Sequence, residues 1–159
     1  MFKSARIHNI DGCQGPTIYA SNGSPQYWAI GRRARKLFGK DSYRRIEAFQ
    51  VEDVWDDDPL KDLERIGEVR MHLEGLRHVV ETRYNLSMAS HPHVSAPHLL
   101  LRATEGSLDI ADVRNPHNVT ATKINDTRIR RHEWVYLVPH DIGYHVDLGG
   151  TARLIFTVR

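Results

Sequence analysis

The chain has 159 residues, which is the length of one ordinary domain. Lysine and arginine number 22 and aspartate and glutamate 20, so the net charge of +2 gives no argument for nucleic acid as a partner. The single cysteine, Cys13, excludes an intrachain disulfide and any cysteine-based metal site, and no apolar run approaches the roughly 18 residues of a transmembrane helix.

The first half of the chain predicts a strand, turns and helices. A short strand is expected over 5–10, and Gly-, Asn- and Pro-rich turn signals follow it up to residue 25. The spacing of Tyr27, Ile30, Ala34, Leu37 and Phe38 predicts an amphipathic helix over 26–38. After Asp58-Pro59, apolar residues recur every three or four positions, which favours a helix over 59–78, although part of that segment could already be strand.

A basic run precedes an acidic one in this half. Residues 32–45 hold seven basic side chains and residues 52–58 hold five acidic ones. One interpretation is a phosphate or nucleic-acid footprint. The alternative, which we favour, is a solvated helix face whose field the acids neutralise within a Debye length.

The second half of the chain predicts strands. From Val80 the apolar period changes to two, which is typical of a half-buried strand over about 80–88. Further strand-like runs, each separated from the next by turn signals, cover residues 98–102, 107–113, 119–124, 133–138 and 153–159. Short strands at this spacing predict a β-sandwich or a β-barrel.

Histidine is the unusual residue, with ten in the chain. His91-Pro92-His93 places two imidazoles on one face of an extended segment, which is half of a metal site, and His98 follows five residues later. His145 lies far downstream, beyond Pro139 and a loop. A solvated polar loop is the alternative interpretation of the cluster.

The order of these features resembles the cupin superfamily. The chain reads His91-Pro92-His93, then His98-Leu99-Leu100-Leu101-Arg102-Ala103-Thr104-Glu105-Gly106, and later Glu133-Trp134-Val135-Tyr136-Leu137-Val138-Pro139 before a loop that carries His145. The resemblance covers about residues 80–159. It implies a mainly β fold, a cupin-like β-barrel (double-stranded β-helix) over 80–159, with a partly helical N-terminal extension over 1–79 packed on it.

The resemblance also implies one divalent transition metal, held by His91, His93 and His145, with His98 as a fourth ligand and His140 as a substitute for His145. Fe(II) is favoured, and Zn(II), Mn(II) or Ni(II) would suit imidazole ligands too. Four neutral ligands would leave an octahedral ion two open positions, for an enolate-like oxygen pair or for substrate together with O₂.

Two further side chains are candidates for contact with substrate. Tyr84 shares a strand face with Thr82 and Leu86 and could hydrogen-bond a substrate, or be a buried tyrosine with a satisfied hydroxyl. Arg102 is four residues after His98 and so projects from the same face of the predicted strand. It could bind a substrate carboxylate, or be an edge-strand charge that faces water.

The expected function is a metal-dependent enzyme that acts on a small organic molecule, and the resemblance implies dioxygenase chemistry first. The alternatives are a non-redox cyclase, isomerase or lyase, in which the metal stabilises an enolate, and a non-catalytic small-molecule-binding cupin. Residues 1–10 lack a hydrophobic signal region, so we expect a cytoplasmic protein without a membrane partner. The exposed edges of a small barrel favour a homodimer.

Overall fold

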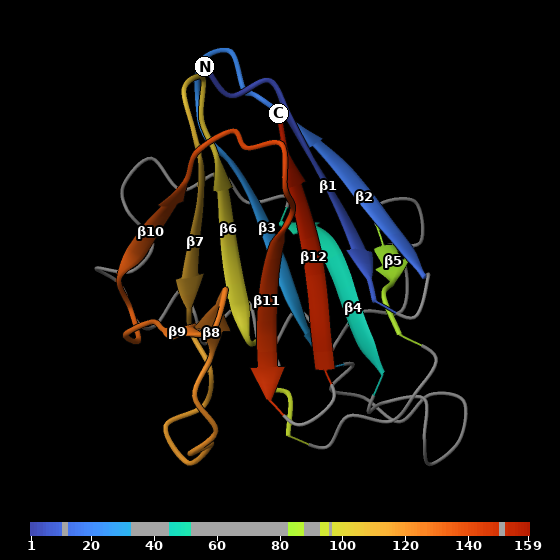
Figure 1. The fold of residues 1–159 in the computed structure, drawn as a ribbon, viewed down its shortest axis with the longest axis vertical. Helices are drawn as coiled ribbons and strands as arrows, with labels where there is room; N and C mark the ends of the chain where they lie inside the picture. Colours follow the sequence, from blue (N-terminus) through green and yellow to red (C-terminus); the bar gives the residue numbers. More distant parts are fainter. Residues whose placement is uncertain (11–12, 33–44, 52–82, 88–92, 96, 150–151) are drawn as a thin grey trace.

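The computed structural model describes residues 1–10, 13–32, 45–51, 83–87, 93–95, 97–149 and 152–159. Within them the chain forms twelve strands and no helix (Figure 1). The strands are β1 (Ser4–Asn9), β2 (Gln14–Tyr19), β3 (Gln26–Arg32), β4 (Ile46–Val51), β5 (Arg83–Asn85), β6 (Leu99–Ala103), β7 (Leu108–Asp112), β8 (Lys123–Ile124), β9 (Thr127–Arg128), β10 (Trp134–Leu137), β11 (Tyr144–Gly149) and β12 (Ala152–Val158).

The described strands form two six-stranded sheets, and every neighbouring pair in them is antiparallel. Sheet 1 has the order β2-β1-β12-β11-β8-β9, and sheet 2 has the order β10-β7-β6-β3-β4-β5. The expectation of a mainly β fold is confirmed. The closed barrel is corrected to two separate sheets, because no strand of one sheet pairs with a strand of the other within the described residues.

The hydrophobic core lies between the two sheets. In β12 buried and half-buried positions alternate, and Leu154 and Phe156 belong to the core together with Leu99 and Ile110 of sheet 2. The middle of sheet 2 is different, because nearly every residue of β3, β6 and β7 is buried. A strand buried on both faces gives a continuous apolar run without the alternation that identifies a half-buried strand.

That continuous run explains the largest error of the sequence analysis. The helix expected over 26–38 is wrong over Gln26–Arg32, which form β3, while residues 33–38 and the helix expected over 59–78 lie outside the described residues. Tyr27 and Ile30 have helical spacing, but Trp28 and Ala29 between them are buried as well. No helix is seen in the described part of residues 1–79, where β1 and β3 pair instead with β12 and β6.

The first 25 residues contain more strand than the turn signals predict. The strand expected over 5–10 is confirmed as β1, and Gln14–Tyr19 add β2 at the end of sheet 1. Pro16 is compatible with β2 because an end strand has one edge without ladder hydrogen bonds. The turn expected at Asn22-Gly23 is present, and Gly23 has the positive φ of 105° that favours glycine.

The strands expected in the second half are mostly confirmed. Four of the five runs after residue 90 correspond to β6, β7, β10 and β12, whereas the run over 119–124 is strand only at Lys123–Ile124. Of the strand expected over 80–88, Arg83–Asn85 form β5 and residues 86–87 are not strand, while 80–82 and 88 lie outside the described residues. Among the described strands β2, β9, β10 and β5 end the two sheets, and the homodimer stays a prediction.

Candidate functional site

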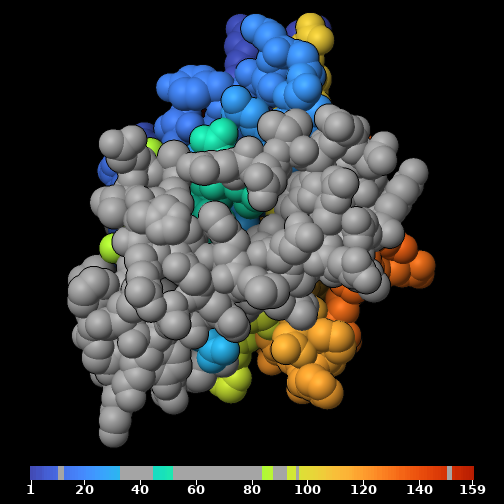
Figure 2. Space-filling model, turned by 180° about the vertical axis from the view of Figure 1, so that it is seen from behind, coloured from blue at the N-terminus to red at the C-terminus, as the bar shows by residue number. Residues whose placement is uncertain are grey.

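One end of the sandwich collects buried and half-buried polar side chains from the segment before β6, the end of β7, the connection from β7 to β8 and the connection from β9 to β10. In Figure 1 this is the lower end, toward which β7 points and from which β6 starts, and the orange loop after β7 projects from the same end in Figures 1 and 2. We call this group the His98 network. It comprises Ser95, His98, Asp112, Arg114, Asn118, Thr122 and Arg131.

His98 is at the centre of the network and has no exposed surface. Its Nδ1 accepts a hydrogen bond from the backbone N–H of Ser95 at 3.0 Å, so the ring proton belongs on Nε2, which lies 2.8 Å from the hydroxyl of Thr122. Burial lowers the pKa of His98 from 6.5 to about 3, and the positive charges of Arg114 and Arg131 contribute further. His98 is therefore neutral, with both ring nitrogens already hydrogen-bonded.

The segment that carries His98 packs closely against β3, because the β3 residue at the contact is Gly31. The backbone N–H of His98 donates to the carbonyl of Ile30, and that of Arg32 donates to the carbonyl of Ser95. A Cβ on Gly31, between these two β3 residues, would lie 2.6 Å from the Ser95 carbonyl oxygen. Only a residue without a side chain permits so close an approach, which holds the His98 backbone against β3.

Asp112 and Arg114 form the charged part of the network. The fully buried carboxylate of Asp112 accepts from Nη1 of Arg114 at 2.6 Å and from its backbone N–H at 3.0 Å. The same Nη1 lies 3.3 Å from the Thr122 hydroxyl, which links this ion pair to His98. A buried carboxylate with a charged donor and a backbone donor is well compensated.

Asn118 connects the network to the histidine motif. Its side-chain amide donates to the backbone carbonyl of His93 at 2.6 Å and to the hydroxyl of Ser95 at 3.1 Å. Its own backbone carbonyl accepts from Nη2 of Arg131 at 2.6 Å. The backbone of His93 is thus held against the end of the sandwich. Its imidazole is exposed and makes no hydrogen bond with the described part of the chain.

The four predicted metal ligands fit that role to different degrees. His91 lies outside the described residues. The exposed ring of His93 fits a ligand role. His98 does not fit in this arrangement, because ligation through either nitrogen requires breaking a buried hydrogen bond.

His145 lies elsewhere in the fold. It is the second residue of β11, exposed, and its neighbour Val146 points into the core, so the His145 ring lies on the outer face of sheet 1. In Figure 1 β11 and β6 run in opposite directions, so the start of β11 and the start of β6 lie toward opposite ends of the sandwich. The structure does not bring His145 together with His98.

The two predicted substrate contacts lie outside the His98 network. Arg102 donates from Nε to the buried carboxylate of Asp109 at 2.8 Å, and its guanidinium carbon is 4.2 Å from the centre of the Trp134 ring. β6 is an inner strand of sheet 2, so Arg102 is not an edge-strand charge. Tyr84, on β5, is 37% exposed and lies beside Trp28, with ring centres 6.1 Å apart. Their contact with a substrate stays a prediction.

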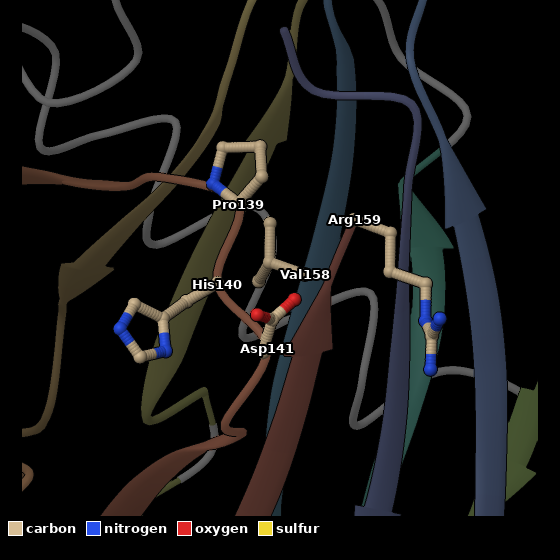
Figure 3. A pocket seen from close by; sticks show the side chains of 5 residues that line it. All are labelled: Pro139, His140, Asp141, Val158 and Arg159. Atoms are coloured by element: carbon tan, nitrogen blue, oxygen red, sulfur yellow. The ribbon is translucent and has the colours of Figure 1, made fainter.

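A surface pocket of about 480 Å³ lies elsewhere, between the end of β12 and the connection from β10 to β11. It is lined by Pro139, His140, Asp141, Val158 and Arg159 (Figure 3). In Figure 3 the side chains of His140 and Arg159 point to opposite sides, with Asp141 between them. Of the candidate histidines only His140, considered as the substitute for His145, lies there, and its Nδ1 accepts from the N–H of Ile142.

The described residues contain no group of three or more His, Cys, Asp or Glu side chains placed to hold a metal ion. In the same part of the chain there is no helix with the length and apolar character needed to cross a membrane. Comparisons with protein-family models, with curated proteins and with solved structures gave no match.

Most of the His98 network was missed by the sequence analysis. Asp112, Arg114, Asn118, Thr122 and Arg131 are ordinary polar residues in or near predicted turns, and only contact across the fold distinguishes them. One signal was available, because Asp112 and Arg114 are two residues apart at the end of a predicted strand and therefore project from the same face.

Proposed function

We propose that the chain is a cupin-like, metal-dependent enzyme that acts on a small organic molecule, with the metal bound by the His91–His93 pair. The observation that carries the proposal is the clamp on His93. Asn118 holds its backbone carbonyl at 2.6 Å, while its imidazole is exposed and makes no hydrogen bond with the described residues. A ligand on a fixed backbone is what a metal site requires.

The proposal assigns different roles to the other two histidines of the motif. His98 is a positioning residue, because its ring connects the Ser95 backbone to Thr122 and so supports the segment that carries His93. His145 lies on the outer face of sheet 1 and is left out of the ligand set. The mainly β fold with two antiparallel sheets is compatible with the proposed class.

A divalent ion held by imidazoles would supply Lewis acidity or a binding position for O₂. Fe(II)-dependent dioxygenase activity is the first candidate, and a non-redox cyclase, isomerase or lyase is the alternative. Consumption of O₂ during turnover separates the two, because only the dioxygenase requires it.

The second candidate function is a non-catalytic small-molecule-binding protein. The observation that favours it is the complete hydrogen bonding of His98, since a third ligand expected from the resemblance is used for structure instead. Such a protein would keep the binding surface at this end of the sandwich without a resident metal.

Elemental analysis of the purified untagged protein tests the proposal, before and after reconstitution with Fe(II), Mn(II), Ni(II) and Zn(II). The wild type is expected to hold close to one equivalent of a transition metal, and His93→Ala is expected to lose it. His145→Ala is the matched control, because it removes an exposed imidazole from the other sheet. Absence of metal in the reconstituted wild type, or loss only in His145→Ala, would overturn the proposal.

A further inference from the structure

The His98 network carries more positive than negative charge. Arg114 and Arg131 both act on His98 and on each other, whereas Asp112 is the only carboxylate that pairs with either of them among the described residues. His98 is neutral and contributes no charge. Among the described residues, two guanidinium groups against one carboxylate leave one positive charge without a counter-charge at this end of the sandwich.

The two guanidinium groups also have unused hydrogen-bond donors. The Nε of Arg114 and the Nε of Arg131 are buried and have no hydrogen-bond partner among the residues that the structure describes. In bonds with the described part of the chain, the side chain of Arg114 uses only Nη1 and that of Arg131 uses only Nη2. A guanidinium has five N–H groups, so each arginine retains donors that suit the oxygens of an anion.

The backbone places Arg131 next to Arg114's ion-pair partner, because Asp112 and Arg131 form an isolated parallel β-bridge and Asp112 pairs with Arg114. The pKa of Arg114 is lowered, chiefly by burial, and the Asp112 carboxylate counteracts this while the Arg131 charge adds to the lowering. Like charges in a partly buried position are costly unless an opposite charge compensates them. An anion bound between them would relieve this cost.

A structural role for Arg131 accounts for only part of this arrangement. Nη2 of Arg131 donates to the carbonyls of Asn118 at 2.6 Å, Pro116 at 3.3 Å and Asn115 at 3.4 Å, which stabilises the turn over 115–118. Three carbonyl groups satisfy one nitrogen of the side chain, but they do not cancel its full charge. The turn alone does not account for the positive charge that no described carboxylate compensates.

We propose that Arg114 and Arg131 bind an oxyanion, a carboxylate or phosphate group of a small molecule. Asn118 links this site to the histidine motif, because its backbone carbonyl accepts from Arg131 and its side chain holds His93. The oxyanion site would therefore give the substrate class of the proposed enzyme, a small organic acid or a phosphorylated compound. That last step rests on the proposed function, whereas the oxyanion site itself does not.

Calorimetric titration of the metal-free protein with inorganic phosphate and, separately, with malonate tests the proposal, with sodium chloride at equal ionic strength as the reference. Saturable binding of phosphate or malonate is expected. The anion that binds more tightly indicates whether the natural group is a phosphate or a carboxylate. A response that chloride reproduces at equal ionic strength would overturn the proposal.

Arg131→Gln is expected to weaken anion binding about tenfold or more, because it removes a charged donor. Arg130→Gln is the matched control, because Arg130 is the sequence neighbour of Arg131 but its side chain is 86% exposed. The anion affinity of Arg130→Gln is expected to equal that of the wild type. Arg131→Lys keeps the positive charge and is the replacement test if Arg131→Gln does not fold. Its anion affinity is expected to lie between those of the wild type and Arg131→Gln. Equal affinities in wild type and in the folded Arg131 variants would refute the site.

The outcome is separable from that of the proposed function. His93→Ala is expected to bind the anion as the wild type does in the absence of metal, because its imidazole takes no part in the arginine pair. Anion binding without any metal binding would leave the oxyanion site in place and refute the metal-dependent enzyme alone.

Discussion

The neutral state of His98 predicts how stability depends on pH. In the folded protein its pKa is lowered from 6.5 to about 3, so the ring stays neutral where an unfolded chain would bind a proton. Between these two pH values the unfolded state holds one more proton at this residue, and acidification therefore favours unfolding. The stabilisation is complete above pH 6.5 and is lost progressively as the pH falls toward 3.

The magnitude follows from the difference between the two pKa values. Each pH unit below 6.5 is expected to remove about 1.4 kcal/mol of stability through His98, which amounts to about 3 kcal/mol by pH 4. Because His98 has no exposed surface, solvent screening does not reduce this effect substantially. Carboxylates also titrate in this range, so the contribution of His98 must be separated from theirs.

A His98→Gln variant makes that separation. Glutamine does not titrate and retains an amide to bond the Thr122 hydroxyl, but it loses the acceptor for the Ser95 N–H. Near pH 7.5 the variant is expected to be less stable than wild type by about 1–3 kcal/mol, the cost of a buried donor without an acceptor. The measurement is urea unfolding at a series of pH values for both proteins.

The stability difference between the two proteins is expected to shrink below pH 6.5 and to disappear by about pH 5, because only the wild type loses the histidine contribution. His93→Ala serves as a control, since its ring is exposed, and its stability curve is expected to follow the wild type. A difference between His98→Gln and wild type that stays constant from pH 7.5 to 4.5 would refute the neutral, buried state of His98.

Two further substitutions test a close backbone approach at the candidate site and a buried ion pair in sheet 2 by urea unfolding. Gly31→Ala is expected to lower the free energy of unfolding by about 1–3 kcal/mol, because the added Cβ would meet the backbone of the segment before β6. Gly106→Ala is the control, because open space surrounds Gly106, and it is expected to change stability by under about 0.5 kcal/mol. Equal effects of the two substitutions would contradict the close approach at Gly31. Asp109→Asn is expected to cost about 1–3 kcal/mol because it removes the charge that compensates Arg102, and Asp147→Asn, in a more exposed ion pair, under about 1 kcal/mol. The reverse ranking would show that the Asp109 pair contributes little.

The strands of the second half were predictable because turn signals separate them and their apolar residues have strand period. The alternation in β12 has buried residues on one face only, so the pattern and the structure agree. β3 could not be identified in the same way, because it is buried on both faces and its apolar run contains helical spacings by chance. Burial on two faces is a property of the whole fold, which a local pattern does not contain.

The histidine motif shows a different limit of the sequence. The spacing of His93 and His98 was a reason to expect a metal site, but spacing does not say which nitrogen atoms are already hydrogen-bonded. The partner that determines the role of His98 is Thr122, 24 positions away in the chain and in the predicted run before β8. Only the fold brings the two together, so the assignment of His98 to ligation or to structure required the three-dimensional contacts.

The two proposed sites must influence each other if both exist. A divalent cation at the His91–His93 pair would repel the positive charge of Arg114 and Arg131 that no described carboxylate compensates, and an oxyanion would reduce that repulsion. Linkage then requires that the anion raise metal affinity and that the metal raise anion affinity by the same factor. The two sites would thus favour metal and anionic substrate together over either alone.

This coupling predicts two effects of Arg131→Gln, one on metal affinity without an anion and one on the increase in metal affinity that malonate causes. Without an anion the variant is expected to bind metal more tightly than wild type, because one repelling charge is removed. Saturating malonate is expected to raise the metal affinity of the variant by a smaller factor than that of the wild type. Malonate also chelates metal in solution, and comparing the two proteins at the same malonate concentration corrects for this. Competition against a metal-sensitive dye measures both affinities. Arg131→Gln affinities that match the wild type in both conditions would show that the two sites are electrostatically independent, and the oxyanion would then have no role in retaining the metal.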